Sequence, residues 1–215
     1  MTTSGIHVYR IQTIESAPEK SKHALQVLRK DFGFVPNVAA IMAESPTLLN
    51  AFVGVFETFH SGTFTGAQRQ VLLLTNAVAN TCAWAVALPS AVALNEGVDE
   101  DDVRAIRANQ RPMDAKHAAL SVFTRALIEK RGHADEQDIA TFTEAGFTHA
   151  QVLEVIVGLA GSTMTNHCGQ PHEPCRRGAV QVANVAAVKP LRSSGHRACW
   201  ALDRAPFARG APVAR

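Results

Sequence analysis

Apolar residues recur every three or four positions through most of the chain, a spacing that places them on one face of an α-helix. Two apolar helical segments follow each other directly between Thr65 and Gly97, with only Asn80 and Thr81 between them. No segment alternates convincingly as a strand, and 8–11 is at most an extended arm. The pattern therefore predicts an all-α protein organised around this central helix pair.

Capping residues and glycines divide the pattern into separate helices. Predicted helix starts are Ser16, Pro36, Ser45, Thr65, Cys82, Asp99, Asp114, Asp135 and Thr148. Predicted ends are Gly33, Met42, Gly62, Gly97, Ala108, Arg131 and Gly146. Because the connections between these helices are short, we expect one helical bundle over residues 1–165.

The end of the chain has a different composition. Residues 166–215 contain eight Lys/Arg and two Asp/Glu, and repeated prolines interrupt any helical period. Only 180–188 could form a short helix or strand. We therefore predict a basic, largely irregular tail, which either a diverged end or a changed reading frame would explain.

Charge and hydropathy argue against several classes of partner. The net charge of the 215 residues is +2, and no aromatic residues are interleaved with the basic ones, so no nucleic-acid partner is expected. No apolar run reaches the length of a membrane span, and the first residues do not resemble a secretory signal. A cytoplasmic location is the expectation.

Cys82 is the main candidate for chemistry. It begins the second central helix, where backbone N–H groups can stabilise a thiolate. The alternative is a small core residue, because free cysteines are among the most buried residue types.

The spacing around Cys82 resembles that of the alkylhydroperoxidase AhpD-like and carboxymuconolactone decarboxylase family, in which a glutamate on one helix precedes C-x-x-C-x-x-x-H at the start of the next. Aligned on this pattern, Gln70 stands at the glutamate position, Cys82 at the first cysteine, Ala85 at the second cysteine and Pro89 at the histidine. The resemblance covers roughly 8–165. It implies an AhpD-like helical bundle that assembles as a dimer, trimer or hexamer.

The resemblance also implies a peroxiredoxin-type, antioxidant activity, in which two cysteines and a histidine reduce hydroperoxides. In this chain Ala85 cannot resolve an oxidised Cys82, Pro89 offers no side-chain acid or base, and Gln70 cannot take a proton at neutral pH. We therefore predict weak or absent peroxidase activity, with Cys82 acting alone and an external thiol as reductant. No cofactor is expected.

Pro89 also affects the helix that carries it. A proline at this interior position removes the hydrogen bond to the Ala85 carbonyl, at a cost of about 3 kcal/mol. We expect a kink that leaves this carbonyl directed into the pocket. A rearranged helix, with Leu88 outside the helical region, is the alternative.

Three further residues are candidate pocket residues beside Cys82. Core packing is the preferred interpretation of Trp84, and the alternative is a wall of an apolar pocket with Phe56 as a neighbour. His60 lies at a helix end near the central pair, where a solvated or capping role competes with a role in the site.

Four possible metal ligands lie close together at the start of the tail: His167, Cys168, His172 and Cys175. Adjacent His and Cys ligands do not fit a regular zinc spacing, so no metal is predicted. Incidental thiols, or a redox partner for Cys82, are the other readings.

Two functions besides peroxide reduction are consistent with the sequence. One is a non-catalytic helical oligomer that binds a small apolar ligand or a protein partner. The other is an enzyme like carboxymuconolactone decarboxylase, whose branch of the family lacks the cysteine pair but retains the histidine that Pro89 replaces here.

Overall fold

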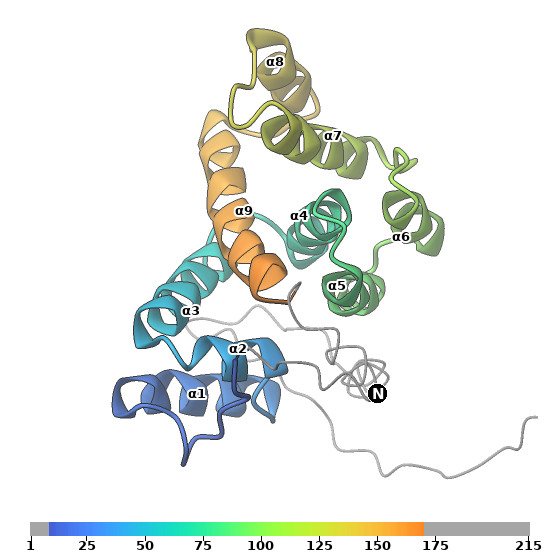
Figure 1. The fold of residues 1–215 in the computed structure, drawn as a ribbon. Coiled ribbons are helices and arrows are strands. Elements are labelled where there is room, and N and C mark those ends of the chain that lie inside the picture. The colour runs from blue at the N-terminus through green and yellow to red at the C-terminus, as the bar shows by residue number, and fades with distance from the viewer. Residues whose placement is uncertain (1–8, 170–215) are drawn as a thin grey trace, which may run out of the picture.

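The computed structural model describes residues 9–169, without the side chains of Asp31, Ala83, Trp84 and Gly169. Within this range the chain forms nine helices and no strand, so the predicted all-α class is confirmed (Figure 1). The helices are α1 (Glu19–Phe32), α2 (Asn37–Met42), α3 (Pro46–His60), α4 (Gly66–Ala79), α5 (Ala83–Asn95), α6 (Glu100–Arg107), α7 (Ala115–Glu129), α8 (Glu136–Glu144) and α9 (His149–Gly169).

The predicted caps fix most of the helix starts. The side chains of Ser45, Thr65, Asp114 and Asp135 each accept a hydrogen bond from a backbone N–H in the first turn of the helix that follows. At Thr65 the Gln68 side chain also returns a bond to the cap residue, which completes a capping box. Local sequence therefore determines where α3, α4, α7 and α8 begin.

Helix α4 occupies the centre of the bundle. It packs against α5, α6, α7 and α9, which surround it in Figure 1. Its buried apolar residues join those of its neighbours in the larger core, which includes Val71, Leu72, Leu74, Val103, Ile106, Leu120, Phe123, Phe142 and Val155. Because α4 has neighbours on most sides, it is buried nearly all round, and its polar residues are enclosed with it.

Helix α9 approaches α3 and α4 closely at a glycine. A Cβ atom on Gly158 would lie 2.7 Å from Phe59 Cε2 and 2.8 Å from Leu72 Cδ2. Further along α9, a Cβ atom on Gly161 would lie 3.3 Å from Val55 Cγ1. Helix α9 therefore runs antiparallel to α3, and the absence of side chains at these positions allows the close packing.

A second core lies between α1, α2 and α3. It contains Leu25, Leu28, Met42, Leu49 and Phe52, with the last turns of α9 packed against it through Met164 and Cys168. Figure 1 shows these N-terminal helices at one end of the bundle, below the layer that contains α4.

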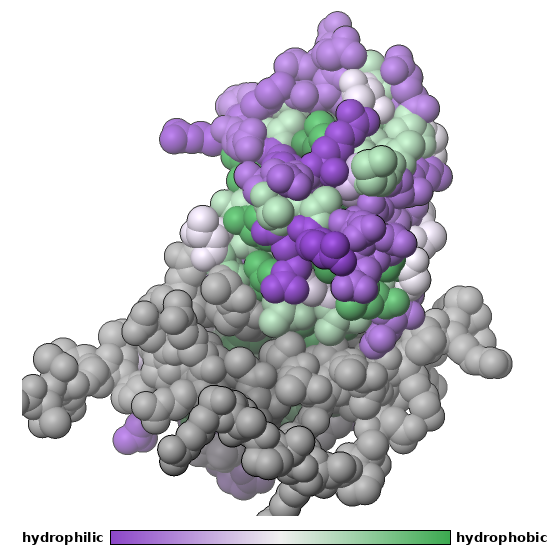
Figure 2. Space-filling view, turned by 90° about the vertical axis from the view of Figure 1, so that its right-hand side faces the viewer, coloured by the Kyte–Doolittle hydropathy of each residue, from purple (hydrophilic) through white to green (hydrophobic). Residues whose placement is uncertain are grey.

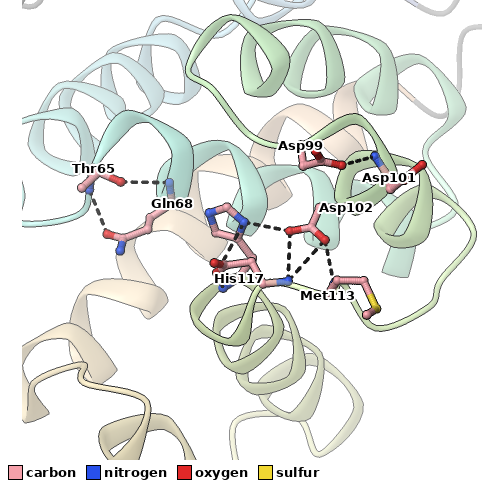
Figure 3. Close-up of polar contacts among 8 residues, drawn as sticks. Thr65, Gln68, Asp99, Asp101, Asp102, Met113 and His117 are labelled. Atoms are coloured by element: carbon pink, nitrogen blue, oxygen red, sulfur yellow. Dashed lines mark hydrogen bonds and ion pairs between the residues drawn. The ribbon is translucent and has the colours of Figure 1, made fainter.

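A buried carboxylate joins α6 to α7. Asp102 accepts hydrogen bonds from the backbone N–H of Met113 (2.7 Å) and of Asp114, and its Oδ2 lies 3.1 Å from His117 Nδ1 (Figure 3). Because all these contacts organise the start of α7, we assign Asp102 and His117 a structural role.

Helix length and surface polarity bear on a membrane span. No helix within residues 9–169 has both the length and the apolar character needed to cross a bilayer. Figure 2 shows polar side chains interspersed with separate apolar patches on the side that it displays. Helix α9 continues four residues past the predicted boundary at 165, and the predicted tail otherwise lies outside the described residues.

Candidate functional site

The turn between α4 and α5 positions Cys82. Thr81 has a positive φ of 52°, and the Cys82 N–H donates to the Ala77 carbonyl at 2.9 Å. This reversal makes Cys82 the N-cap residue of α5 and leaves it only 2% exposed. Its hydrophobic neighbours are Ala77, Ala85 and Val86.

The thiol does not point at the amides of its own helix. No side-chain capping bond forms at Cys82; instead its Sγ donates to the main-chain carbonyl oxygen of Asn166 in α9, at 3.6 Å. A carbonyl acceptor stabilises the protonated thiol, whereas helix amides would stabilise a thiolate. The thiol contact that fixes Cys82 in this geometry is therefore with α9, and thiolate stabilisation by the first turn of α5 stays a prediction.

Of the three altered family positions, Ala85 on α5 and Gln70 on α4 are buried, and Pro89 on α5 is half-buried. Ala85 follows Cys82 by one turn, and its N–H donates to the Cys82 carbonyl at 3.0 Å. Gln70 is buried and lies seven residues before Ala77, on the same stripe of α4 as that Cys82 neighbour. At these positions Ala85 and Gln70 supply neither a second thiol nor a base.

Pro89 lies inside α5, which remains helical from Ala83 to Asn95. The alternative of a rearranged helix is therefore wrong. One turn before it, the Val86 carbonyl accepts a bond from the Ser90 hydroxyl at 2.7 Å, which adds a side-chain partner next to the proline. Pro89 gives the site no group that could transfer a proton.

His60 and Phe56 belong to a different cluster of side chains. Their rings lie 4.0 Å apart between centroids, and His60 Nδ1 is 2.8 Å from the Phe56 carbonyl oxygen. His60 is buried, not solvated as expected, and burial lowers its pKa to about 4. Phe56 packs with Phe52 and Met164, whereas Cys82 has other hydrophobic neighbours. The side chain of Trp84 lies outside the described residues.

Asn166 and Asn76 are site residues that the sequence analysis did not single out. Both are fully buried at 0% exposure. Among the described residues, neither polar atom of the Asn166 amide has a hydrogen-bond partner, and Asn76 Nδ2 has none either. Asn166 also lies four residues after Ser162, and both are buried. Two polar residues one turn apart in the otherwise apolar α9 were the sequence signal that could have indicated a buried polar site.

Metal binding gains no support in the described part of the chain. No group of three or more His, Cys, Asp and Glu side chains gathers there. His167 and Cys168 end α9, while His172 and Cys175 lie outside the described residues. Burial raises the pKa of the Cys168 thiol, which favours its protonated, unreactive form.

Comparisons with known proteins address the family. The carboxymuconolactone decarboxylase family model matches residues 46–127, which contain α3 to α6 and most of α7. No curated protein matches the sequence.

Solved structures with the same fold cover most of this chain. One is an uncharacterized peroxidase-related protein with an alkylhydroperoxidase AhpD core from Ralstonia eutropha JMP134, with 18% identity, a TM-score of 0.66, and coverage of 77% of this chain and 92% of that chain. A second is a cysteine-to-alanine variant of the debrominase Bmp8 in complex with 2,3,4-tribromopyrrole. Its identity is 16%, its TM-score is 0.63, and the match covers 84% of this chain and 100% of that chain. A third is an uncharacterized peroxidase-related protein from Silicibacter sp. TM1040. Its identity is 18%, its TM-score is 0.62, and the match covers 85% of this chain and 93% of that chain.

The matched segment includes the whole α4–α5 pair, and the neighbours share the surrounding bundle. Identities below one fifth establish the fold and leave the reaction open. The chain therefore has an AhpD-like fold, and its residues 46–127 match the carboxymuconolactone decarboxylase family model.

Proposed function

We propose that this chain is a single-cysteine thiol peroxidase, in which Cys82 reduces a hydroperoxide slowly and an external thiol restores it. The observation that carries the proposal is the position of Cys82: it stands at the start of α5, within the matched family segment, and faces α4 and α9. Within α5 it has no second cysteine, so the cycle needs a reductant from outside the helix.

The chemistry requires two steps. The Cys82 sulfur attacks one peroxide oxygen, the O–O bond breaks, and the leaving oxygen takes the thiol proton to depart as an alcohol or water. The resulting sulfenic acid then reacts with two equivalents of a small thiol, which regenerates Cys82 and forms a disulfide and water. The carbonyl contact of Sγ and its burial both predict slow attack, because the thiolate is the nucleophile.

Steady-state peroxide consumption with dithiothreitol tests this function. A variant that retains Cys82 and carries Cys168→Ser, Cys175→Ser and Cys199→Ser should consume peroxide as the wild type does. Cys82→Ser alone should fall to the rate of dithiothreitol without protein. Equal rates for wild type and Cys82→Ser would contradict the proposal.

A second candidate function is binding of a small apolar ligand without catalysis. Half-buried aromatic rings from α1, α3 and the connection after α1 favour it: Phe32, Phe34 and Phe56 pack with Phe52 and His60. Titration with a fluorescent apolar probe tests it, and Phe56→Ala should weaken binding while leaving Cys82 chemistry unchanged. Unchanged probe affinity in this variant would exclude the aromatic cluster as the binding site.

A further inference from the structure

The inference concerns the interface between α4 and α9 beside Cys82. Two contacts fix how these helices align: Gly158 lies against Leu72, and the Asn166 carbonyl lies against Cys82 Sγ. Both helices therefore advance in the same direction along their interface. Asn76 lies one turn after Leu72, and Ser162 lies one turn after Gly158, so both fall between the two fixed contacts.

The residues in this interval are polar and buried. Asn76 and Asn166 are fully buried, and Ser162 is nearly so. We call Asn76, Ser162 and Asn166 the amide seam. It is an unusual place for amides, because the rest of the α4–α9 contact is made by residues such as Leu72, Val155 and Gly158.

The hydrogen bonds of the seam are incomplete. Asn76 Oδ1 accepts from Asn80 Nδ2 at 2.7 Å, whereas Asn76 Nδ2, Asn166 Nδ2 and Asn166 Oδ1 have no partner within residues 9–169. Leaving a buried amide group without a partner costs roughly 1–3 kcal/mol, and leucine of similar shape would avoid that cost. Such groups call for an explanation, and a functional site that binds a small polar molecule is one.

The missing partner must satisfy definite requirements. It must be small, since Cys82 and both asparagines are almost wholly enclosed. It must both donate and accept hydrogen bonds, since the unpartnered atoms are two amide nitrogens and one carbonyl oxygen. The residue that carries two of the unpartnered atoms also contacts the thiol, because the Asn166 main-chain carbonyl accepts from Cys82 Sγ. Hydrogen peroxide and the hydroxyl of a cysteine sulfenic acid both meet these requirements.

We propose that the amide seam binds the substrate oxygens: Asn166 and Asn76 hold hydrogen peroxide against Cys82 and then stabilise the oxygen transferred to sulfur. An amide N–H donates to the peroxide oxygen under attack, and Asn166 Oδ1 accepts from its O–H group. The S–O bond forms as the O–O bond breaks, and the departing hydroxide takes the thiol proton to become water. This inference rests on the proposed function and specifies its substrate as a small hydroperoxide.

Single-turnover oxidation of the Cys82-only protein tests this role. The protein, with Cys168→Ser, Cys175→Ser and Cys199→Ser, is mixed with hydrogen peroxide, and Cys82 sulfenic acid is trapped with dimedone and measured by mass spectrometry. In Asn166→Leu the rate should fall roughly tenfold or more, the expected effect of losing a charge-stabilising hydrogen bond in the transition state. Asn76→Leu should lower the rate as well.

Stability separates this role from a structural one. Because the seam amides lack partners, Asn166→Leu should leave the denaturation midpoint unchanged or raise it. Thr124→Val is the matched control, since Thr124 Oγ1 is also buried without a partner but lies in α7. It should preserve the oxidation rate. If Asn166→Leu does not fold, Asn166→Ala provides the comparison of oxidation rate, since the cavity that it leaves lowers stability in either case.

The outcomes are distinct. Slower oxidation in a folded Asn166 variant, with an unchanged rate in Thr124→Val, would support the seam. Equal oxidation in wild type and in both Asn166 variants would overturn the seam while leaving the proposed function intact. Loss of stability in a folded Asn166→Leu would assign the amide a structural role and overturn the inference. No sulfenic acid in the Cys82-only protein would overturn the proposed function, and the seam with it.

Discussion

At the scale of single residues, this protein has a cysteine at the first position of the family pattern, Cys82, and other residue types at the remaining positions. Cys82 keeps its place at the start of α5, but its thiol donates to a carbonyl, and Ala85, Pro89 and Gln70 supply no resolving thiol or base. The same residues that make the family recognisable therefore also predict a slow reaction.

His60 provides a prediction about pH. Its pKa is about 4 in the folded protein and about 6.5 in an unfolded chain, because burial disfavours the charged ring. Between these values the unfolded state binds more protons, so the free energy of unfolding should fall as the pH drops from about 6.5 to 4, by about 3 kcal/mol in total.

Urea denaturation across this pH range checks the His60 prediction. His60→Gln should remove that part of the pH dependence, whereas His149→Gln, at an exposed helix start, should leave it unchanged. An identical pH dependence in wild type and His60→Gln would show that another group controls acid stability.

The site could be predicted from sequence only in part. The position of Cys82 and the three altered family positions followed from spacing along two consecutive helices. Its acceptor, Asn166, is 84 residues away in sequence, and the separation of the His60 cluster from Cys82 depends on how α3 and α9 pack. Such contacts arise from tertiary packing, which local periodicity does not specify.

At the scale of helices, replacing two glycines with alanine should change the stability of the protein in opposite directions. Gly158→Ala would place a Cβ within 2.8 Å of Leu72 and 2.7 Å of Phe59. Both neighbours are buried, so we expect a loss of roughly 1–3 kcal/mol of stability from overpacking.

Gly54→Ala is the matched control for Gly158→Ala. Nothing lies within 4 Å of its added Cβ, and Gly54 is inside α3, so alanine should raise stability by up to about 1 kcal/mol through its higher helix propensity. Chemical denaturation of both variants tests the pair. Equal stability changes would contradict the close α9 packing.

The helices themselves were largely predictable. Caps such as Ser45, Thr65 and Asp114 act within one turn, so the sequence alone located those helix starts correctly. The last helix was harder to delimit, since α9 continues to Gly169 through residues that lack a clear apolar period. At Pro89 the surrounding bundle keeps α5 helical despite the local cost.

At the scale of the whole molecule, the fold is that of AhpD-like proteins, and the family segment provides its central helices. Assembly as a homo-oligomer stays a prediction. Exposed Leu153 and Ile156 on α9 are the residues of that helix available for such an interface.

The central claim is that α4 and α5 form an AhpD-type redox frame from which three side chains have been lost. If so, Gln70→Glu, Ala85→Cys and Pro89→His together should create a dithiol peroxidase, because residues 82 and 85 are one turn apart and removing the proline restores a helix N–H.

The measurement is steady-state peroxide consumption by this triple variant, beside the wild type and the triple variant that also carries Cys82→Ser. We predict a rate at least about tenfold above wild type, from the restored acid–base group and resolving thiol, and its loss with Cys82→Ser. A folded triple variant that consumes peroxide no faster than wild type would contradict the account.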